Sequence, residues 1–170
     1  MIDVRIDGYD AAAAAGQSSV VHRAYSEQYP PGPPVDEWCD GMWSRHRARD
    51  GFDLLIARDG DDLVGLVWGY VGGRGQYWTD LAVASLPHAV AEAWLGGHFE
   101  VVELIVNPAY RRRGVGRALL GEILARSSKA RAVLSVDDDN VAAQSLYESM
   151  GWEVLGPFSS GKSVMGVVLR

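Results

Sequence analysis

The distribution of apolar and polar positions predicts strands and helices that alternate along the chain. Strands are predicted where apolar residues alternate with polar ones or form short runs, at 4–6, 52–57, 63–71, 99–106, 131–136, 152–155 and 163–169. Helices are predicted where apolar residues recur every three or four positions, at 11–26, 35–49, 81–94, 115–127 and 140–150. This alternation indicates one α/β domain over residues 1–170, with a mixed sheet flanked by helices.

Three connections between these elements stand out. Residues 29–34, Tyr-Pro-Pro-Gly-Pro-Pro, cannot be helical and form a stiff connector. Residues 59–62, Asp-Gly-Asp-Asp, are typical of a hairpin turn between two strands. Residues 72–98 are long for a connection between strands, so we interpret them as a candidate functional insertion.

Composition narrows the class of protein. With 48% apolar and 22% charged residues among 170, the chain is an ordinary globular protein with enough length for a core. The net charge of −6 argues against nucleic-acid binding, and neither a membrane span nor a secretory leader is expected. The single cysteine, Cys39, excludes an internal disulfide and suits the reducing cytoplasm.

The segment 101–117, Val-Val-Glu-Leu-Ile-Val-Asn-Pro-Ala-Tyr-Arg-Arg-Arg-Gly-Val-Gly-Arg, is the most informative part of the chain. An apolar strand ends at Asn-Pro, and a short turn leads through three arginines and two glycines into a helix. A helix N-terminus and exposed loop amides present N–H donors to an anion, and arginine adds positive charge. The segment therefore predicts a site for the pyrophosphate of a phosphorylated cofactor.

Spacing separates the possible cofactors. A nucleotide-binding loop of the Walker type requires Lys-Ser/Thr after its last glycine, where this chain has Arg117-Ala118. A dinucleotide fingerprint requires a third glycine where Leu119 stands, and a first glycine close to the end of the strand. Asp137 lies about 20 residues beyond the glycines, where a ribose-binding acid is found in such folds, so a nicotinamide enzyme stays an alternative.

Two motifs in this order carry a resemblance to a known family. Residues 111–116 match Gln/Arg-x-x-Gly-x-Gly/Ala, and residues 140–152 match Asn-x-x-Ala-x-x-Leu-Tyr-x-x-x-Gly-Phe, with Trp152 in the place of Phe. Together they resemble the cofactor-side motifs of the GNAT superfamily, the acyl-CoA-dependent N-acetyltransferases. The resemblance covers residues 99–156.

This resemblance implies a mostly antiparallel sheet in which the strand 101–106 splays away from 132–136 and leaves room for the cofactor. It also implies transfer of an acetyl group from acetyl-CoA to a primary amine. We expect direct transfer, because Cys39 lies outside the motif region, and no metal, because no His/Cys/Asp spacing suggests a metal site. We expect a small-molecule acceptor and a monomer or homodimer. A protein N-terminal or lysine acetyltransferase, or a non-catalytic acyl-CoA-binding module, are the alternatives. Acceptor specificity falls on residues 25–45, 157–163 and the insertion.

The resemblance also assigns roles to individual residues. Cofactor contacts, many of them from backbone amides, fall on Leu104, Ile105, Val106, Arg111, Arg112, Arg113, Gly114, Val115, Gly116, Arg117 and Asn140. The backbone N–H of Leu104 would polarise the acetyl carbonyl. Not every arginine need touch phosphate, and Asn140 also fits a plain helix cap.

Two side chains are the candidate catalytic groups. Glu103 is the one acid within 101–106, and we expect burial to raise its pKa toward neutrality, as suits a general base acting through water. An ion pair with an arginine is the alternative role for Glu103. Tyr147 matches the motif tyrosine that protonates the leaving thiolate, although packing in the core would also explain it. Ser135 stands in the region where part of the family carries a glutamate instead.

Overall fold

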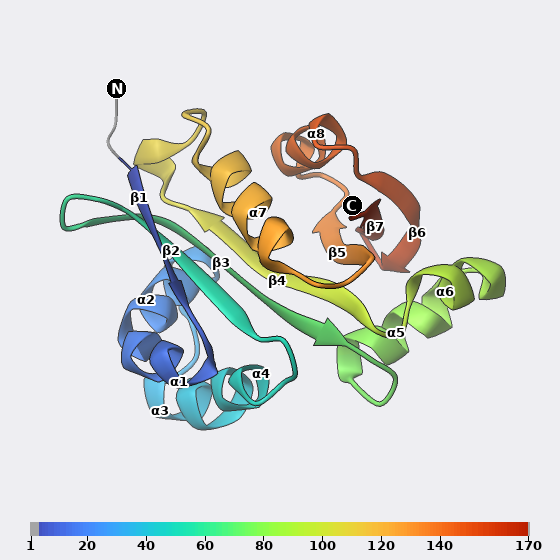
Figure 1. Cartoon of the computed structure of the whole chain (residues 1–170), viewed down its shortest axis with the longest axis horizontal. Helices are drawn as coiled ribbons and strands as arrows, with labels where there is room; N and C mark the ends of the chain where they lie inside the picture. The colour runs from blue at the N-terminus through green and yellow to red at the C-terminus, as the bar shows by residue number, and fades with distance from the viewer. Residues whose placement is uncertain (1–3, 170) are drawn as a thin grey trace. The chain divides into compact units, whose positions relative to one another are not determined.

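The computed structural model describes residues 4–169 (Figure 1). Its strands are β1 (Val4–Tyr9), β2 (Asp53–Asp59), β3 (Asp62–Gly72), β4 (His98–Val106), β5 (Arg131–Asp137), β6 (Glu153–Ser159) and β7 (Lys162–Val168). Its α-helices are α1 (Ala11–Ala14), α2 (Ser18–Gln28), α3 (Val35–Trp38), α4 (Ser44–Arg47), α5 (Tyr77–Ser85), α6 (His88–Trp94), α7 (Val115–Arg126) and α8 (Val141–Ser149). Among the described residues, no helix has the length and apolar character needed to cross a membrane.

The strands form a seven-stranded sheet in the order β1-β2-β3-β4-β5-β7-β6. The pairs β1–β2, β2–β3, β5–β7 and β6–β7 are antiparallel, whereas β4 and β5 are parallel. The registered pairs between β4 and β5 are Phe99 with Ala132 and Glu100 with Val133, at the beginning of both strands. This sheet confirms the predicted α/β fold with a mixed, mostly antiparallel sheet.

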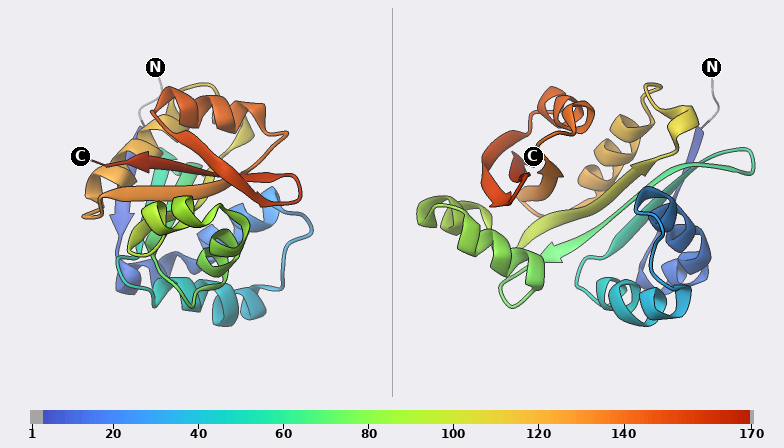
Figure 2. Two further views of the ribbon diagram at one scale, coloured as in Figure 1. Left: turned by 90° about the vertical axis from the view of Figure 1, so that its right-hand side faces the viewer. Right: turned by 180° about the vertical axis from the view of Figure 1, so that it is seen from behind.

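The chain divides into two compact units, and β3 and β4 each run from one unit into the other. The first unit comprises the residues up to Tyr70 together with Val102–Arg126. In it, α1–α4 cover one face of the strands and α7 covers the other, as the ribbon views agree in showing (Figures 1 and 2). Because two strands are shared in this way, we keep the proposal of one domain over residues 1–170.

The core of the first unit is rich in tryptophan. Trp38 and Trp43 stack with their ring centroids 5.2 Å apart, and Trp43 meets Trp68 edge to face at 5.6 Å. Residues 35–49 were expected to form one regular helix, but Cys39–Trp43 is a π-helix between α3 and α4. A wider turn brings residues five apart onto one face, so the π-helix places both indoles of the stack in the core.

The helix predicted at 11–26 is also interrupted. A 3-10 turn over Ala15–Gln17 separates α1 from α2, and the hydroxyl of Ser18 donates to the Ala15 carbonyl over 2.8 Å. Gly16 has a low helix propensity, and serine side chains compete for backbone hydrogen bonds. The interruption therefore follows from the local sequence.

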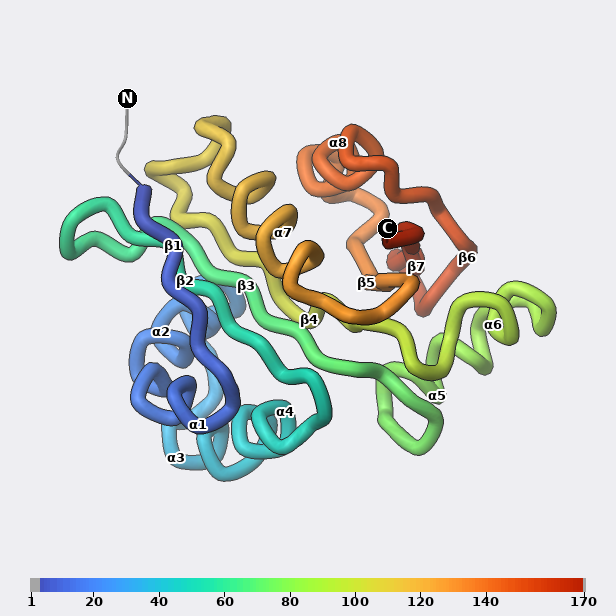
Figure 3. The backbone as a smooth tube through the Cα atoms, viewed as in Figure 1, coloured from blue at the N-terminus to red at the C-terminus, as the bar shows by residue number. Residues whose placement is uncertain are grey.

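The second unit comprises Val71–Val101 and Ser127–Arg170. The tube trace shows α8 on one side of β5–β7 and the pair α5–α6 on the other (Figure 3). The prediction of a single helix over 81–94 is wrong, because Pro87 separates α5 from α6 and Leu86 before it is extended. Proline disfavours helical geometry in the residue that precedes it.

The insertion at 72–98 packs against β5, β6 and β7 through its apolar side. Its buried members and the strand residues they meet are Ala82, Leu86, Ala91, Leu95, Val133 and Val164. The indole Nε1 of Trp78 donates to the hydroxyl of Ser135 over 3.1 Å, and the Trp78 ring stacks on Phe158 at 5.2 Å. The insertion is thus part of the core of the second unit rather than a loose loop.

Candidate active site

The turn after β4 forms the first part of the site. The Asn107 side chain accepts from the Ala109 amide over 3.0 Å and so caps the 3-10 turn Pro108–Tyr110. Arg112 and Gly114 then take positive φ angles of 64° and 83° before α7 begins. Alternating backbone conformations of this kind turn successive N–H groups to one side and make an anion-binding concavity.

Gly114 is needed in this turn for its conformation rather than for space. A Cβ at Gly114 would meet nothing within 4 Å, but its φ of +83° is one that L side chains rarely adopt. The first bond of α7 runs from the Ala118 amide to the Gly114 carbonyl over 3.0 Å. The N-terminus of α7, which carries the positive end of the helix dipole, therefore begins directly after this turn.

The arginines of the turn differ in what they contact. Arg111 donates through Nε to the Val106 carbonyl over 3.1 Å, which ties the turn to the end of β4. Arg113 lies over the ring of Tyr110 at 5.6 Å from its centroid. Arg112 is exposed. Arg111 and Arg113 are exposed as well, but they also brace the turn through these contacts.

A cavity of about 630 Å³ lies beside this turn, within the first unit. Its lining comes from α2, from the first residues of β3 and from the end of β4 with the turn. Arg23 and Glu27 on α2 and Asp62 on β3 give it mixed charge, and Arg111 faces it from the turn. The side chain of Arg111 is thus shared between the strand end and this cavity.

The end of β4 carries the residues that lead into the turn. Ile105 is buried in the aromatic core cluster of the first unit, and Val102 packs against the same cluster. Leu104 is half-buried, as is Val106 beyond it.

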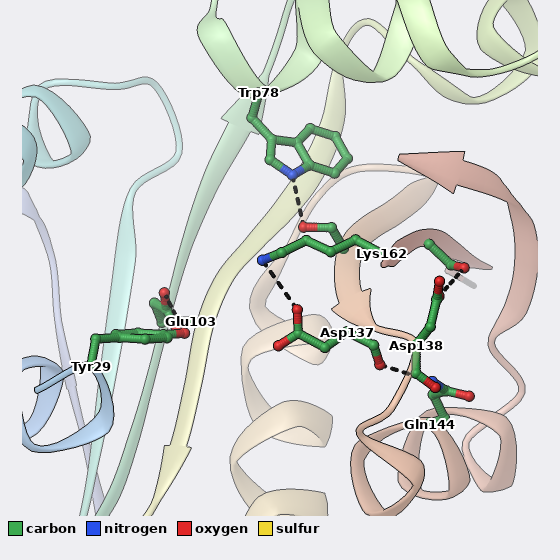
Figure 4. A network of polar contacts seen from close by, with 9 residues as sticks. Tyr29, Trp78, Glu103, Asp137, Asp138, Gln144 and Lys162 are labelled. Atoms are coloured by element: carbon green, nitrogen blue, oxygen red, sulfur yellow. Dashed lines mark hydrogen bonds and ion pairs between the residues drawn. The ribbon is translucent and has the colours of Figure 1, made fainter. Parts of the chain in front are cut away.

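Glu103 lies in the same stretch and is bound by a tyrosine from the connector (Figure 4). The hydroxyl of Tyr29 donates to both carboxylate oxygens of Glu103, over 3.1 and 2.9 Å. The expected deep burial of Glu103 is wrong, because its side chain is only half-buried. Hydrogen bonds donated to a carboxylate favour the charged form, so the contact with Tyr29 opposes the effect expected from burial.

Sequence reasoning missed a more deeply buried acid on β4. Glu100 is 2% exposed, three residues before Glu103 and just outside the segment 101–106 that suggested the base. His98, two residues earlier, is 0% exposed and accepts from the Gly96 amide through Nδ1 over 3.0 Å. No local signal distinguished these two polar residues from surface positions of a strand.

The second unit holds the other motif residues. Asn140 caps α8 by accepting from the Ala143 amide over 3.1 Å, as its place before the helix predicted. Tyr147 is buried near the end of α8, and its ring lies 5.8 Å from that of Trp152. Both motif residues are held on one short, capped helix, which fixes their spacing.

Polar contacts around the end of β5 join three elements of the second unit (Figure 4). Gln144 on α8 donates to the Asp137 carbonyl over 2.9 Å, and Lys162 on β7 lies 3.4 Å from the Asp137 carboxylate. Ser163 donates to Asp138 over 2.6 Å. These contacts give Asp137 and Asp138 structural roles, and the described residues contain no cluster of three or more side chains suited to a metal ion.

The chain is similar to known acetyltransferases in sequence and in fold. A family model described as the acetyltransferase (GNAT) family matches residues 19–152. A GCN5-like protein acetyltransferase of Mycobacterium tuberculosis is 30% identical over 98 residues, which cover 53% of this chain and 48% of that protein. The N-alpha-acetyltransferase RimI of the same organism is 43% identical over 58 residues, covering 34% of this chain and 37% of RimI.

A mycothiol acetyltransferase of Clavibacter sepedonicus is 45% identical over 49 residues, covering 29% of this chain and 16% of that enzyme. The chain thus spans about half or less of these curated relatives. An acetyltransferase of Thermus thermophilus has the same fold, with a TM-score of 0.68 at 14% identity over 98% of this chain and 97% of that one. The chain belongs to the acetyltransferase (GNAT) family.

Proposed function

We propose that the protein moves an acetyl group from acetyl-CoA directly to a primary amine, most simply that of a small molecule. The observation that carries this proposal is the turn between β4 and α7, with Arg112 and Gly114 at positive φ. Such a concavity at a helix N-terminus suits a pyrophosphate. A GNAT-fold N-acetyltransferase of Thermoplasma acidophilum has been solved with coenzyme A, with a TM-score of 0.61 at 14% identity.

In this proposal the backbone amides of 112–117 bind the pyrophosphate, and the arginines of the turn add charge around it. Backbone groups of Leu104, Ile105 and Val106 bind the pantetheine arm, and Asn140 adds a contact from α8. When bound, acetyl-CoA supplies an activated thioester, so no metal is required. Cys39 lies in the π-helix of the first unit, apart from these residues in the chain, which favours direct transfer over a covalent acetyl-enzyme.

Three groups of the chain would then do the chemistry. Glu103 removes a proton from the amine through a water molecule, because a carboxylate held ionised can accept one. The Leu104 N–H, near the end of β4, donates to the carbonyl oxygen as negative charge develops on it. Tyr147 returns a proton to the departing thiolate, whose basicity is comparable to that of a phenol.

The acceptor is the least determined part of the proposal. The net charge of −6 suits a cationic acceptor, and we take a small amine rather than a peptide tail as the first candidate. The GCN5-like relative is named for protein acetylation, RimI for N-alpha-acetylation and the mycothiol enzyme for a small molecule. A protein N-terminus or lysine is therefore the second candidate. We expect a cytoplasmic protein, since the single cysteine suits a reducing compartment. We also expect a monomer or homodimer.

Thiol release from acetyl-CoA tests the proposal, measured with a panel of small amines and with peptides bearing a free N-terminus or lysine. Release that depends on an amine and matches the acetylated product by mass supports the proposal. Binding of CoA with no release by any acceptor would indicate a non-catalytic acyl-CoA-binding module. Binding of NAD(H) without binding of CoA would instead support the alternative of a nicotinamide enzyme.

A further inference from the structure

We propose that Tyr29 is a positioning residue for the Glu103 carboxylate, holding it ionised and oriented for proton abstraction. The proposal rests on the proposed function, because it concerns the base of that reaction. It stands on the two hydrogen bonds of 3.1 and 2.9 Å from one hydroxyl to both oxygens of one carboxylate. The single phenolic proton is shared by both oxygens, which keeps the carboxylate turned toward Tyr29 and favours its charged form.

The backbone of Tyr29 is held from both sides. The Tyr29 amide donates to the Tyr25 carbonyl over 3.0 Å and closes α2, and the Gly32 amide donates to the Tyr29 carbonyl over 2.9 Å. Gly32 has a φ of +75°, and a Cβ there would come within 2.4 Å of the Ser26 side chain. The connector therefore folds back tightly on α2, and Tyr29 has little freedom to leave its place.

The far end of the connector is also tied to α2. The ring nitrogen Nε2 of His22 donates to the Pro33 carbonyl over 2.8 Å. The Tyr29 ring packs on Tyr25 with centroids 4.9 Å apart, and Tyr25 packs on Trp38 at 5.8 Å. Tyr29 is nevertheless 46% exposed, so its hydroxyl is presented by a rigid aromatic base while one side of the ring faces solvent.

Two phenols of the first unit lie near the carboxylate. The Tyr29 hydroxyl donates to it directly. From α2, Tyr25 is near enough that burial and, secondarily, the charge of Glu103 raise the pKa of its phenol. The contact with the Tyr29 hydroxyl is therefore the one by which the connector supports an ionised Glu103.

Nuclear magnetic resonance of glutamate carboxyl carbons tests the link without a known acceptor. The Glu103 signal is assigned by its loss in Glu103→Gln, and its titration midpoint is compared in wild type and Tyr29→Phe. Phenylalanine keeps the ring on Tyr25 and removes only the donor. We expect the midpoint to rise by about half to one pH unit, because the charged form loses its donor. Tyr77→Phe, at a tyrosine 81% exposed on α5, is the matched control and leaves the midpoint in place.

Kinetics then tests the positioning role. With an active acceptor, Tyr29→Phe shifts the acidic limb of kcat/KM upward by the same amount, so that the rate on that limb falls about 3- to 10-fold. An unchanged Glu103 midpoint in Tyr29→Phe overturns the link whether or not acetyl transfer is found. A limb that persists in Glu103→Gln overturns the positioning role even if the midpoint moves. Failure to bind CoA, in contrast, refutes the proposed function alone.

Discussion

The backbone amide of Gly96 donates to Nδ1 of His98 over 3.0 Å, and this hydrogen bond keeps a fully buried imidazole in its neutral form. Burial, and secondarily the charge of Arg131, lower the pKa of His98 to about 4. His46 is similar, because its Nδ1 accepts from Trp68 over 3.2 Å and burial lowers its pKa to about 4 as well. Protonation at Nδ1 would break either hydrogen bond.

Stability is expected to fall as the pH is lowered from 7 to 5. Above about pH 6.5 these histidines are neutral in both the native and the unfolded state. Below that pH the histidines of the unfolded chain bind protons, whereas those of the native state stay neutral. At pH 5 His98 alone should cost about 1–2 kcal/mol of unfolding free energy. Urea titrations at both pH values check this.

The variant His98→Asn keeps an acceptor for Gly96 and removes the titrating ring. Between pH 7 and 5 the unfolding free energy of this variant should fall by about 1–2 kcal/mol less than that of wild type. His88→Asn, at an exposed position on α6, serves as the control and retains the wild-type pH dependence. An equal loss of stability in wild type and His98→Asn would contradict the account.

Gly72 leaves the space that His98 occupies. A Cβ on Gly72 would lie 2.1 Å from Nε2 of His98, whereas at the adjacent Gly73 it would meet nothing within 4 Å. We expect Gly72→Ala to destabilise the protein by about 1–3 kcal/mol, because overpacking forces a buried side chain to move. Gly73→Ala is the control. Equal midpoints of thermal unfolding for the two variants would contradict this prediction, because they would show that the end of β3 adapts to the added methyl group without loss of stability.

Tyr147→Phe tests the assigned proton donor. The ring keeps its packing near Trp152, and the hydroxyl is lost. We expect kcat to fall by roughly 10- to 1000-fold with little change in CoA affinity, as for loss of one general acid. Full activity on a verified acceptor would assign Tyr147 to the core alone.

The sequence predicted most strands and the turn of the site because these depend on local patterns. The Asn-Pro stop, the glycines and the apolar face of 115–127 each act over a few residues, and β4, the turn and α7 follow them. The break at Pro87 also had a local signal, but the apolar run around it outweighed that signal in the prediction. The π-helix at 39–43 had none, because its wider turn is stabilised by the tryptophan core.

Contacts across long separations were not predictable. Tyr29 and Glu103 are 74 positions apart, and nothing near either residue indicates the other. The family resemblance implied that residues 25–45, which include Tyr29, help to determine acceptor specificity. The composition of residues 29–34, however, predicted only a stiff connector. Burial of Glu100 and His98 likewise depends on how the sheet packs against the insertion. The alternation of apolar and polar residues within β4 does not predict this packing.

The affinity of CoA for the turn after β4 tests the central claim most directly. Isothermal calorimetry would compare CoA binding by wild type and by Gly116→Asp, which places a negative charge in the first turn of α7. Gly121→Asp on the same helix is the control, because a Cβ there meets nothing within 4 Å. An acid near a helix N-terminus favours folding, so lost binding would reflect repulsion of the pyrophosphate. We predict micromolar binding by wild type and Gly121→Asp, and binding about 100-fold weaker, or ~3 kcal/mol, for Gly116→Asp. Equal CoA affinity in all three proteins would contradict the account.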